Sequence, residues 1–509
     1  MHDSSELPAR RRPPYKGTST KLVVSIDVGT TFTAASFCVL QPGNIPKFRE
    51  VLRWPKQAVP EAKVPSVLYY DGANKACAFG AETEDDNTIM EAEESGWRKT
   101  EWFKLHLRPP HLPIIKNLKL PALPKNVTVD DIFADHFRYV TEQVKNVISS
   151  SYGGGAEMWE MLSPQMFVIL TTPNGWEGLQ QHRLRQAAVK AGIVDAAGGQ
   201  RVKFVTEAEA AVLYAIDTGS VDGWLVQYSK RNMPLDLLKG YRWGNKDAID
   251  KLMISFEHAK RKFDGPDTTS WIQVDGIESV TGLNIVRGKL KISGEIMASF
   301  YEHSLTCIKE GLGIAFENGL KMADVSTCKL GGRENGIAVC RPDGPTTKAV
   351  ANGALAWHVD NTVSSRYAKD YYGIEIEIPF NAENEEHAGQ PAYMSTDGVL
   401  SVQHVWNGIV DKNVKIKTCK EFMKEYCEDV PIPTQLPFVY SVPIFVYRKA
   451  NKPRTFTTSI GKGYQPGFEV ICTVRGDLSQ CLLQAPARVS PTGSHYRTIH
   501  VVPNVRFVG

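Results

Sequence analysis

Residues 22 to 33 combine the side chains that a phosphate-binding turn needs. The segment runs Leu-Val-Val-Ser-Ile-Asp-Val-Gly-Thr-Thr-Phe-Thr, so Asp27 ends an apolar, β-branched stretch. A carboxylate at the end of a buried strand is costly unless it faces a cation, and hydrated Mg²⁺ is a suitable one. Gly29 permits a tight turn and the close approach of a phosphate, while Thr30 and Thr31 add hydroxyl and amide donors. The alternative is an ordinary hairpin with Gly-Thr at its tip.

The composition limits the classes of partner. Lys and Arg number 59 against 56 Asp and Glu, without a basic stripe of interleaved aromatic residues, so we expect no nucleic-acid partner. The nine cysteines are scattered without a C-x-x-C pair, which argues against a disulfide framework or a zinc site and favours a reducing, cytoplasmic location. No apolar run of about 18 residues exists, so we expect no membrane span. The absence of G-x-x-x-x-G-K-[ST] excludes a Walker-type site.

Apolar periodicity predicts alternating strands and helices in the first half of the chain. Strands are expected around the Gly-Thr-Thr turn at 21–40, and an amphipathic helix is expected at 128–150. Further along, we predict a strand at 166–170, a helix at 178–191, a strand at 202–205 and a helix at 208–216. Such an order is typical of an α/β domain.

The second half of the chain changes character. We predict a charged helix at 246–263, a β-like stretch at 271–292, helical residues at 294–319 and a final helix at 347–368. Short β-type runs follow a Pro-, Asn- and Glu-rich stretch at 376–391. Together these patterns predict a disordered leader at 1–20, an α/β domain at 21–376 and a smaller, mainly-β domain at 390–509.

The opening turn resembles the first phosphate loop of the heat shock protein 70 (Hsp70) family, and four further segments match that family in order. They are Phe103-Lys104-Leu105, Val168 to Pro173 with the helix after it, Phe204 to Ala211, and Phe256 to Arg261. Gly331-Gly332 and the segment from Arg341-Pro342-Asp343 to Ala354 are similar to the family's remaining adenosine-side pieces. The segment from Thr347 to Gly373 looks most like the divergent heat shock protein 12A branch and its fungal relatives.

The resemblance implies an actin-like ATPase domain of two ribonuclease H-like lobes, with ATP or ADP and Mg²⁺ between them. It implies that Asp27 holds Mg²⁺ through water and that Lys104 and Glu207 position the attacking water. The residues implied to bind nucleotide are Gly29, Thr30, Thr31 and Phe32 at the phosphates, and Glu257, Lys260, Arg261, Gly331, Gly332 and Asp343 at the adenosine. The alternatives are a solvated Lys104, a helix N-terminal carboxylate at Glu207, and an exposed, salt-bridged helix face at 257–261.

One part of the family's pattern is absent from the sequence. The family places a second phosphate loop, an Asp followed by Gly-Gly-Gly-Thr, between the segments that hold Glu207 and Glu257, and that stretch contains no such loop. Phosphoryl transfer depends on positioning and charge stabilisation, so the loss of one phosphate clamp should weaken Mg-ATP binding and slow hydrolysis. The acidic, leucine-rich linker and the long helical lid of typical members are also not found.

Three functions remain open from the sequence. The first is a chaperone-type ATPase whose nucleotide state governs the binding of unfolded or extended polypeptide clients. The second is a degenerate, non-hydrolysing nucleotide-binding or interaction protein, and the third is a sugar kinase of the same superfamily. Residues 395 to 509 would form either a reduced peptide-binding module or a purely structural β domain.

Overall fold

The chain divides into two units in a computed structural model. The structure describes residues 12–110, 112, 119–176, 178–217, 255–256, 259–260, 262–263, 267–274, 284–299, 346–361, 363, 365–417, 421–459, 463–502 and 504–506. The first unit combines residues 1–220 with 343–509, and the second spans residues 221–342. Several sheets alternate with helices, so the chain is a mixed α/β protein.

A six-stranded sheet forms the centre of the first unit. Its strands are β1 (Lys21–Val28), β2 (Phe32–Leu40), β3 (Arg49–Glu50), β4 (Val64–Pro65), β8 (Phe167–Thr172) and β9 (Val202–Thr206). The order is β3-β2-β1-β8-β9, with β4 paired to β2. β1 runs antiparallel to β2 but parallel to β8, and β8 runs parallel to β9. β1 and β8 are nearly continuous apolar runs because helices cover both faces of this sheet.

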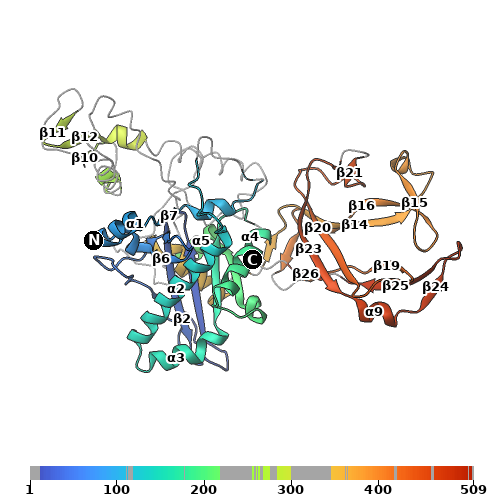
Figure 1. The fold of residues 1–509 in the computed structure, drawn as a ribbon, viewed down its shortest axis with the longest axis horizontal. Helices are drawn as coiled ribbons and strands as arrows, with labels where there is room; N and C mark the ends of the chain where they lie inside the picture. The colour runs from blue at the N-terminus through green and yellow to red at the C-terminus, as the bar shows by residue number, and fades with distance from the viewer. Residues whose placement is uncertain are drawn as a thin grey trace, which may run out of the picture. The chain divides into compact units, whose positions relative to one another are not determined.

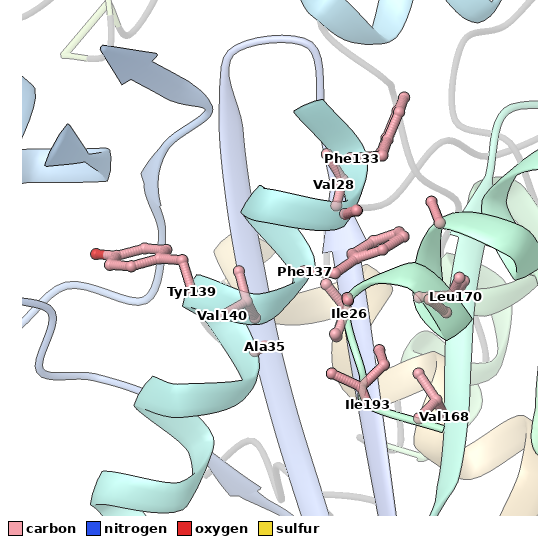
Figure 2. Packing of buried hydrophobic residues seen from close by; sticks show 14 of the residues in the cluster. Ile26, Val28, Ala35, Phe133, Phe137, Tyr139, Val140, Val168, Leu170 and Ile193 are labelled. Carbon is pink, nitrogen blue, oxygen red and sulfur yellow. The ribbon is translucent and has the colours of Figure 1, made fainter. Parts of the chain in front are cut away.

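One face of the sheet packs against α2 (Val129–Ser151) and α4 (Gly178–Lys190). A capping box starts α2: the Thr128 hydroxyl accepts from the Asp131 amide, and the Asp131 carboxylate accepts from the Thr128 amide. Figure 2 shows buried residues of this layer, among them Ile26, Val28, Ala35, Phe133, Phe137 and Val140. The helix predicted at 128–150 is therefore confirmed.

The opposite face packs against α5 (Glu207–Asp217) and α8 (Ala349–Asp360). Val23, Ile169 and Val205 of the sheet share a buried cluster with Ala210, Ala354 and Leu355 of the two helices. α5 and α8 cross at Gly353, where an added Cβ would lie 1.7 Å from the carbonyl oxygen of Ala210. The crossing is therefore possible only because this residue has no side chain.

Residues 12 to 20 belong to the predicted leader and contact this unit. Arg12 donates from Nε to Asp360 Oδ1 at 3.2 Å, beside an ion pair with Asp217. The amide of Tyr15 donates to the Asn44 carbonyl at 2.8 Å. The described part of the leader is thus attached to the ends of α5 and α8.

Smaller elements complete the N-terminal part of this unit. They are β5 (Val67–Tyr70), β6 (Ala76–Phe79), β7 (Arg98–Glu101), α1 (Asp86–Glu94) and α3 (Gly155–Leu162). The three strands form a sheet in the order β6-β5-β7.

The residues after α8 are mainly strands, coloured orange to red in Figure 1. They are β13 (Ser365–Tyr367), β14 (Tyr371–Pro379), β15 (Ala392–Met394), β16 (Leu400–Val410), β17 (Lys415–Lys417), β18 (Glu421–Met423), β19 (Tyr426–Pro431), β20 (Val439–Tyr447), β21 (Thr458–Ser459), β22 (Gly463–Tyr464), β23 (Phe468–Asp477), β24 (Ala487–Val489), β25 (His495–Val501) and β26 (Asn504–Arg506), with one short helix, α9 (Ser479–Gln484). The main sheet has the order β15-β16-β14-β20-β23, and a second has the order β19-β25-β24.

The described part of the second unit holds a small antiparallel sheet. Its strands are β10 (Thr269–Gln273), β11 (Ile285–Val286) and β12 (Lys289–Ser293), in the order β10-β12-β11. Residues 294–299 are helical, in agreement with the start of the predicted helix at 294–319.

The final helix predicted at 347–368 is wrong in its last part. α8 ends at Asp360, and Asn361 follows in the left-handed conformation with φ 45°. Residues 365–367 instead form β13, which pairs antiparallel with β17. Left-handed Asn is a common helix end, and the strand depends on a partner about fifty residues away, which local periodicity does not reveal.

Candidate functional site

Three chemistry-bearing side chains meet at one edge of the central sheet. Asp27 lies near the carboxyl end of β1, Thr171 near that of β8, and Glu207 follows β9 directly. Because β1, β8 and β9 are parallel neighbours, their carboxyl ends share this edge. Ligands of open α/β sheets bind outside the carboxyl ends of the strands. The edge is therefore the candidate site.

A backbone hydrogen bond closes the turn between β1 and β2. The amide of Gly29 donates to the Phe32 carbonyl at 2.9 Å, and a Cβ at Gly29 would lie 2.5 Å from that same oxygen. Glycine is thus required for the turn to close. Within the described residues, the amides of Thr30 and Thr31 donate to no acceptor. Successive unpaired amides in a turn suit a phosphate.

The carboxylate of Asp27 is buried and partnered on both oxygens. Asp27 is 5% exposed, and its Oδ1 accepts a hydrogen bond from Thr171 Oγ1 at 2.7 Å. The ammonium of Lys63 lies 4.0 Å from Oδ2. A buried carboxylate at the open edge of a sheet is a hard oxygen ligand of the kind that holds hydrated Mg²⁺. The residues present therefore fit a phosphate with its metal.

Lys104 and Glu207 form an ion pair beside this carboxylate. Lys104 lies on the 3₁₀ helix η2 (Phe103–Leu107), is 5% exposed, and donates from Nζ to Glu207 Oε1 at 2.5 Å. The face of Trp176 lies 5.8 Å from the same ammonium. Burial rules out the alternative of a solvated lysine. Glu207 is also the first residue of α5, where the helix dipole favours a carboxylate.

A small cavity borders Lys104 and Thr171. Its volume is about 10 Å³, near the lower limit for one water molecule. Its other lining residues are apolar, among them Ile26, Val28 and Trp176. A ligand larger than a water molecule therefore does not fit in this cavity.

A directed chain of hydrogen bonds supports the turn from behind. Ser66 Oγ donates to the Gly29 carbonyl at 2.9 Å, and Thr33 Oγ1 lies 2.9 Å from Ser66 Oγ and 2.7 Å from His136 Nε2. A carbonyl can only accept, so the single hydroxyl proton of Ser66 is donated to Gly29. The Ser66 oxygen must then accept from the Thr33 hydroxyl, and the Thr33 oxygen must accept from Nε2 of His136. His136 is therefore the Nε2-protonated tautomer.

The buried imidazole of His136 predicts a loss of stability in mild acid. Burial lowers the pKa of His136 from 6.5 to about 3, so the folded protein keeps the ring neutral while the unfolded chain takes up a proton below pH 6.5. The contribution of the neutral His136 ring to the free energy of unfolding is complete above pH 6.5 and is lost as the pH falls toward 3. For one such proton, we expect the free energy of unfolding to fall by roughly 2 kcal/mol between pH 7.5 and 5. Urea denaturation at both pH values measures it.

The control variants isolate the contribution of His136. His136→Leu should flatten the pH dependence by that amount, whereas His182→Leu should leave it as in the wild type because the side chain of His182 is exposed. Burial, with Lys203 and Lys21, lowers the pKa of His358 to about 4. Every variant should therefore still lose some stability in acid through His358. Equal slopes for wild type and His136→Leu would contradict the prediction.

The adenosine side of the predicted site lies mostly outside the described residues. This holds for Glu257, Arg261, Gly331, Gly332 and Asp343, and for the stretch in which a second phosphate loop was sought. Lys260 is described, and its ammonium lies 5.8 Å from the centre of the Phe256 ring within the second unit.

Sequence reasoning missed Lys63 and the role of Thr171. Lys63 stands in the Pro-rich extended stretch before β4, where its type and spacing gave no signal. Thr171 stood at the end of a predicted strand. Its place at the carboxyl end of a strand next to the strand of Asp27 was the signal that could have indicated its contact with Asp27. Within the described ranges, no group of three His, Cys, Asp or Glu side chains is arranged to hold a metal ion alone, and no helix there has the length and apolarity of a membrane span.

Comparison with known proteins gives a distant match. No protein-family model matches the chain. Heat shock 70 kDa protein 12A of Homo sapiens is 25% identical over 197 residues, which are 38% of this chain and 28% of that protein. The Mus musculus protein of the same name gives the same identity and coverage. The chain thus spans just over a quarter of the length of the curated relatives it matches. It is therefore distantly similar to an Hsp70-type protein, heat shock 70 kDa protein 12A.

Proposed function

We propose that this chain is an Hsp70-like protein that binds ATP or ADP at the turn of residues 29–32. The observation that carries the proposal is the convergence of Asp27, Thr171 and Glu207 at one sheet edge, with Lys104 paired to Glu207. The distant similarity to heat shock 70 kDa protein 12A supports the same class.

The proposed architecture follows from the central sheet. Three antiparallel strands followed by two parallel ones, in the order β3-β2-β1-β8-β9, are what a ribonuclease H-like half would contain. The proposal places a second such lobe in the remainder of residues 21–376 and a separate mainly-β domain at 390–509. Residues 1–20 are proposed as a leader.

Each residue at the edge has a proposed task. The amides of Thr30 and Thr31 would bind phosphate oxygens, and Asp27 would hold Mg²⁺ through water. When bound, Mg²⁺ would neutralise charge on the phosphates. Lys104 and Glu207 would position the attacking water. Glu257, Lys260, Arg261, Gly331, Gly332 and Asp343 remain proposed contacts of the adenosine.

A thermal-shift experiment tests the proposal. Mg-ATP at about 100 times its Kd should stabilise the protein by roughly 2.7 kcal/mol, which corresponds to a rise in Tm of about 3 °C for a domain of this size. Gly29→Val, whose side chain would collide with the Phe32 carbonyl, should abolish the response. Gly72→Ala is the matched control because a Cβ at that position meets nothing within 4 Å. An unchanged Tm of the wild type at millimolar ATP rejects the proposal.

A non-hydrolysing binding protein is the second candidate, and one observation favours it. The sequence between Glu207 and Glu257 has no Asp-x-Gly-Gly-Gly-Thr, the motif that forms the second phosphate loop in the Hsp70 family. Steady ATP hydrolysis that disappears in Asp27→Ala would exclude this candidate and support the chaperone-type ATPase. In the first candidate, the Hsp70-like chaperone-type protein, residues 390–509 would bind extended polypeptides in the cytoplasm.

A further inference from the structure

Ser66 contacts the turn between β1 and β2 at two points of its backbone. The hydroxyl donates from Oγ to the Gly29 carbonyl at 2.9 Å, and the amide donates to the Thr31 carbonyl at 2.9 Å. Ser66 is 1% exposed, so solvent does not reach its side chain. One buried residue therefore holds the backbone on both sides of the segment Thr30-Thr31.

The contact with Gly29 sets the direction of the Thr30 amide. The peptide that joins Gly29 to Thr30 is planar and trans, so its carbonyl and its N–H point in opposite directions. Because the Gly29 carbonyl points to Ser66, the Thr30 N–H points away from Ser66. Among the residues that the structure describes, this amide has no acceptor. The Thr31 amide belongs to the next peptide, which lies between the two carbonyls that Ser66 holds.

Paired strands on both sides of Ser66 hold its backbone in place. On one side, Pro65 of β4 pairs with Phe32 of β2. On the other side, Val67 of β5 pairs with Glu101 of β7. Ser66 therefore joins the central sheet to the three-stranded sheet, and its position does not depend on the turn that it contacts.

Thr33 and His136 restrict the Ser66 hydroxyl to one arrangement of hydrogen bonds. The Ser66 oxygen accepts from the Thr33 hydroxyl at 2.9 Å, and the Thr33 oxygen accepts from Nε2 of His136 at 2.7 Å. His136 is fully buried, and its ring meets the ring of Phe103 edge to face at 5.5 Å. A hydroxyl has a single proton to donate, so this chain of donors ends at the Gly29 carbonyl.

We propose that Ser66 is a positioning residue of the nucleotide site, which holds the amides of Thr30 and Thr31 in the orientation that binds phosphate oxygens. Donors that the protein holds in place before the ligand arrives lose little freedom on binding, so they favour affinity. The inference rests on the proposed function and names the residue that orients its phosphate-binding amides.

Calorimetric titration of the full chain with Mg-ATP tests the proposal. Ser66→Ala removes the hydroxyl and should raise the Kd by about tenfold or more, the effect of losing one charge-assisted contact with a phosphate. Ser66→Thr keeps the hydroxyl and should bind within about threefold of the wild type. A role in packing alone predicts the reverse, because threonine adds a methyl group at a buried position and alanine adds nothing.

The matched control is Ser25→Ala on β1. Ser25 is also buried, and it donates from Oγ to the Ala351 carbonyl at 2.8 Å. Both alanine variants lose a buried hydrogen bond and should lower the Tm, but only Ser66→Ala should raise the Kd. The Tm of each variant shows whether it is folded. If Ser66→Thr is not folded, Ser66→Cys replaces it: cysteine is close to serine in size but a weak donor, so its Kd should also rise.

Two results would overturn the inference and leave the proposed function intact. One is a folded Ser66→Ala or Ser66→Cys variant that binds Mg-ATP within about threefold of the wild type. The other is a rise in Kd for Ser25→Ala as large as that for Ser66→Ala, since any lost buried hydrogen bond would then weaken binding. A wild-type chain that binds no Mg-ATP overturns both the inference and the proposed function.

Discussion

Gly353→Ala should destabilise the first unit by at least about 3 kcal/mol, beyond the usual range for one added methyl group. The new Cβ would lie 1.7 Å from the Ala210 carbonyl oxygen and 2.5 Å from its carbonyl carbon. These atoms are backbone, so no side chain can move to make room, and α5 must separate from α8. α5 starts with Glu207, so the same separation would disturb the candidate site.

Urea denaturation followed by circular dichroism measures this effect. Gly178→Ala is the matched control, because Gly178 also lies in a helix, α4, but a Cβ there meets nothing within 4 Å. Alanine in that helix should be neutral or slightly stabilising. A Gly353→Ala variant with the denaturation midpoint of the wild type would show that α5 and α8 are not in contact at this residue.

Local sequence signals predicted the elements that carry the candidate site. The apolar run before Asp27, the helical repeat from Val129 and the alternation through Thr206 gave β1, α2, β8 and β9 close to their bounds. These elements are long, strongly patterned and buried, so local pattern and tertiary packing agree. The helix end near Asp360 failed because β13 depends on a distant partner.

The contacts within the site could not be derived from spacing. Lys104 and Glu207 are 103 positions apart, and Thr171 and Asp27 are 144 apart. Such pairs come together only through the sheet order, which periodicity does not fix. Lys104 and Glu207 were nominated through the family resemblance alone, and Lys63 had no matching motif to nominate it.

The Lys104–Glu207 pair should give an asymmetric double-mutant cycle. The side chain of Lys104 is 6% exposed and that of Glu207 is 15% exposed. Glu207→Ala strands a buried ammonium, and breaking a buried pair in this way should cost about 3–5 kcal/mol of unfolding free energy. Lys104→Met keeps an apolar stem among Phe133, Leu170 and Trp176 and leaves the more exposed carboxylate, so it should cost less.

The decisive outcome is rescue: Lys104→Met added to Glu207→Ala should restore part of the lost stability, because the double variant no longer buries the Lys104 ammonium without the Glu207 carboxylate. The pair Lys99–Glu101, at 3.3 Å with side chains 51% and 36% exposed, is the matched control. Its coupling should stay below about 1 kcal/mol, since exposed ion pairs are screened by water. If the losses in unfolding free energy at Lys104 and Glu207 were additive, the two charges would be hydrated separately. The ion pair on which the proposed nucleotide site depends would then not form at this edge.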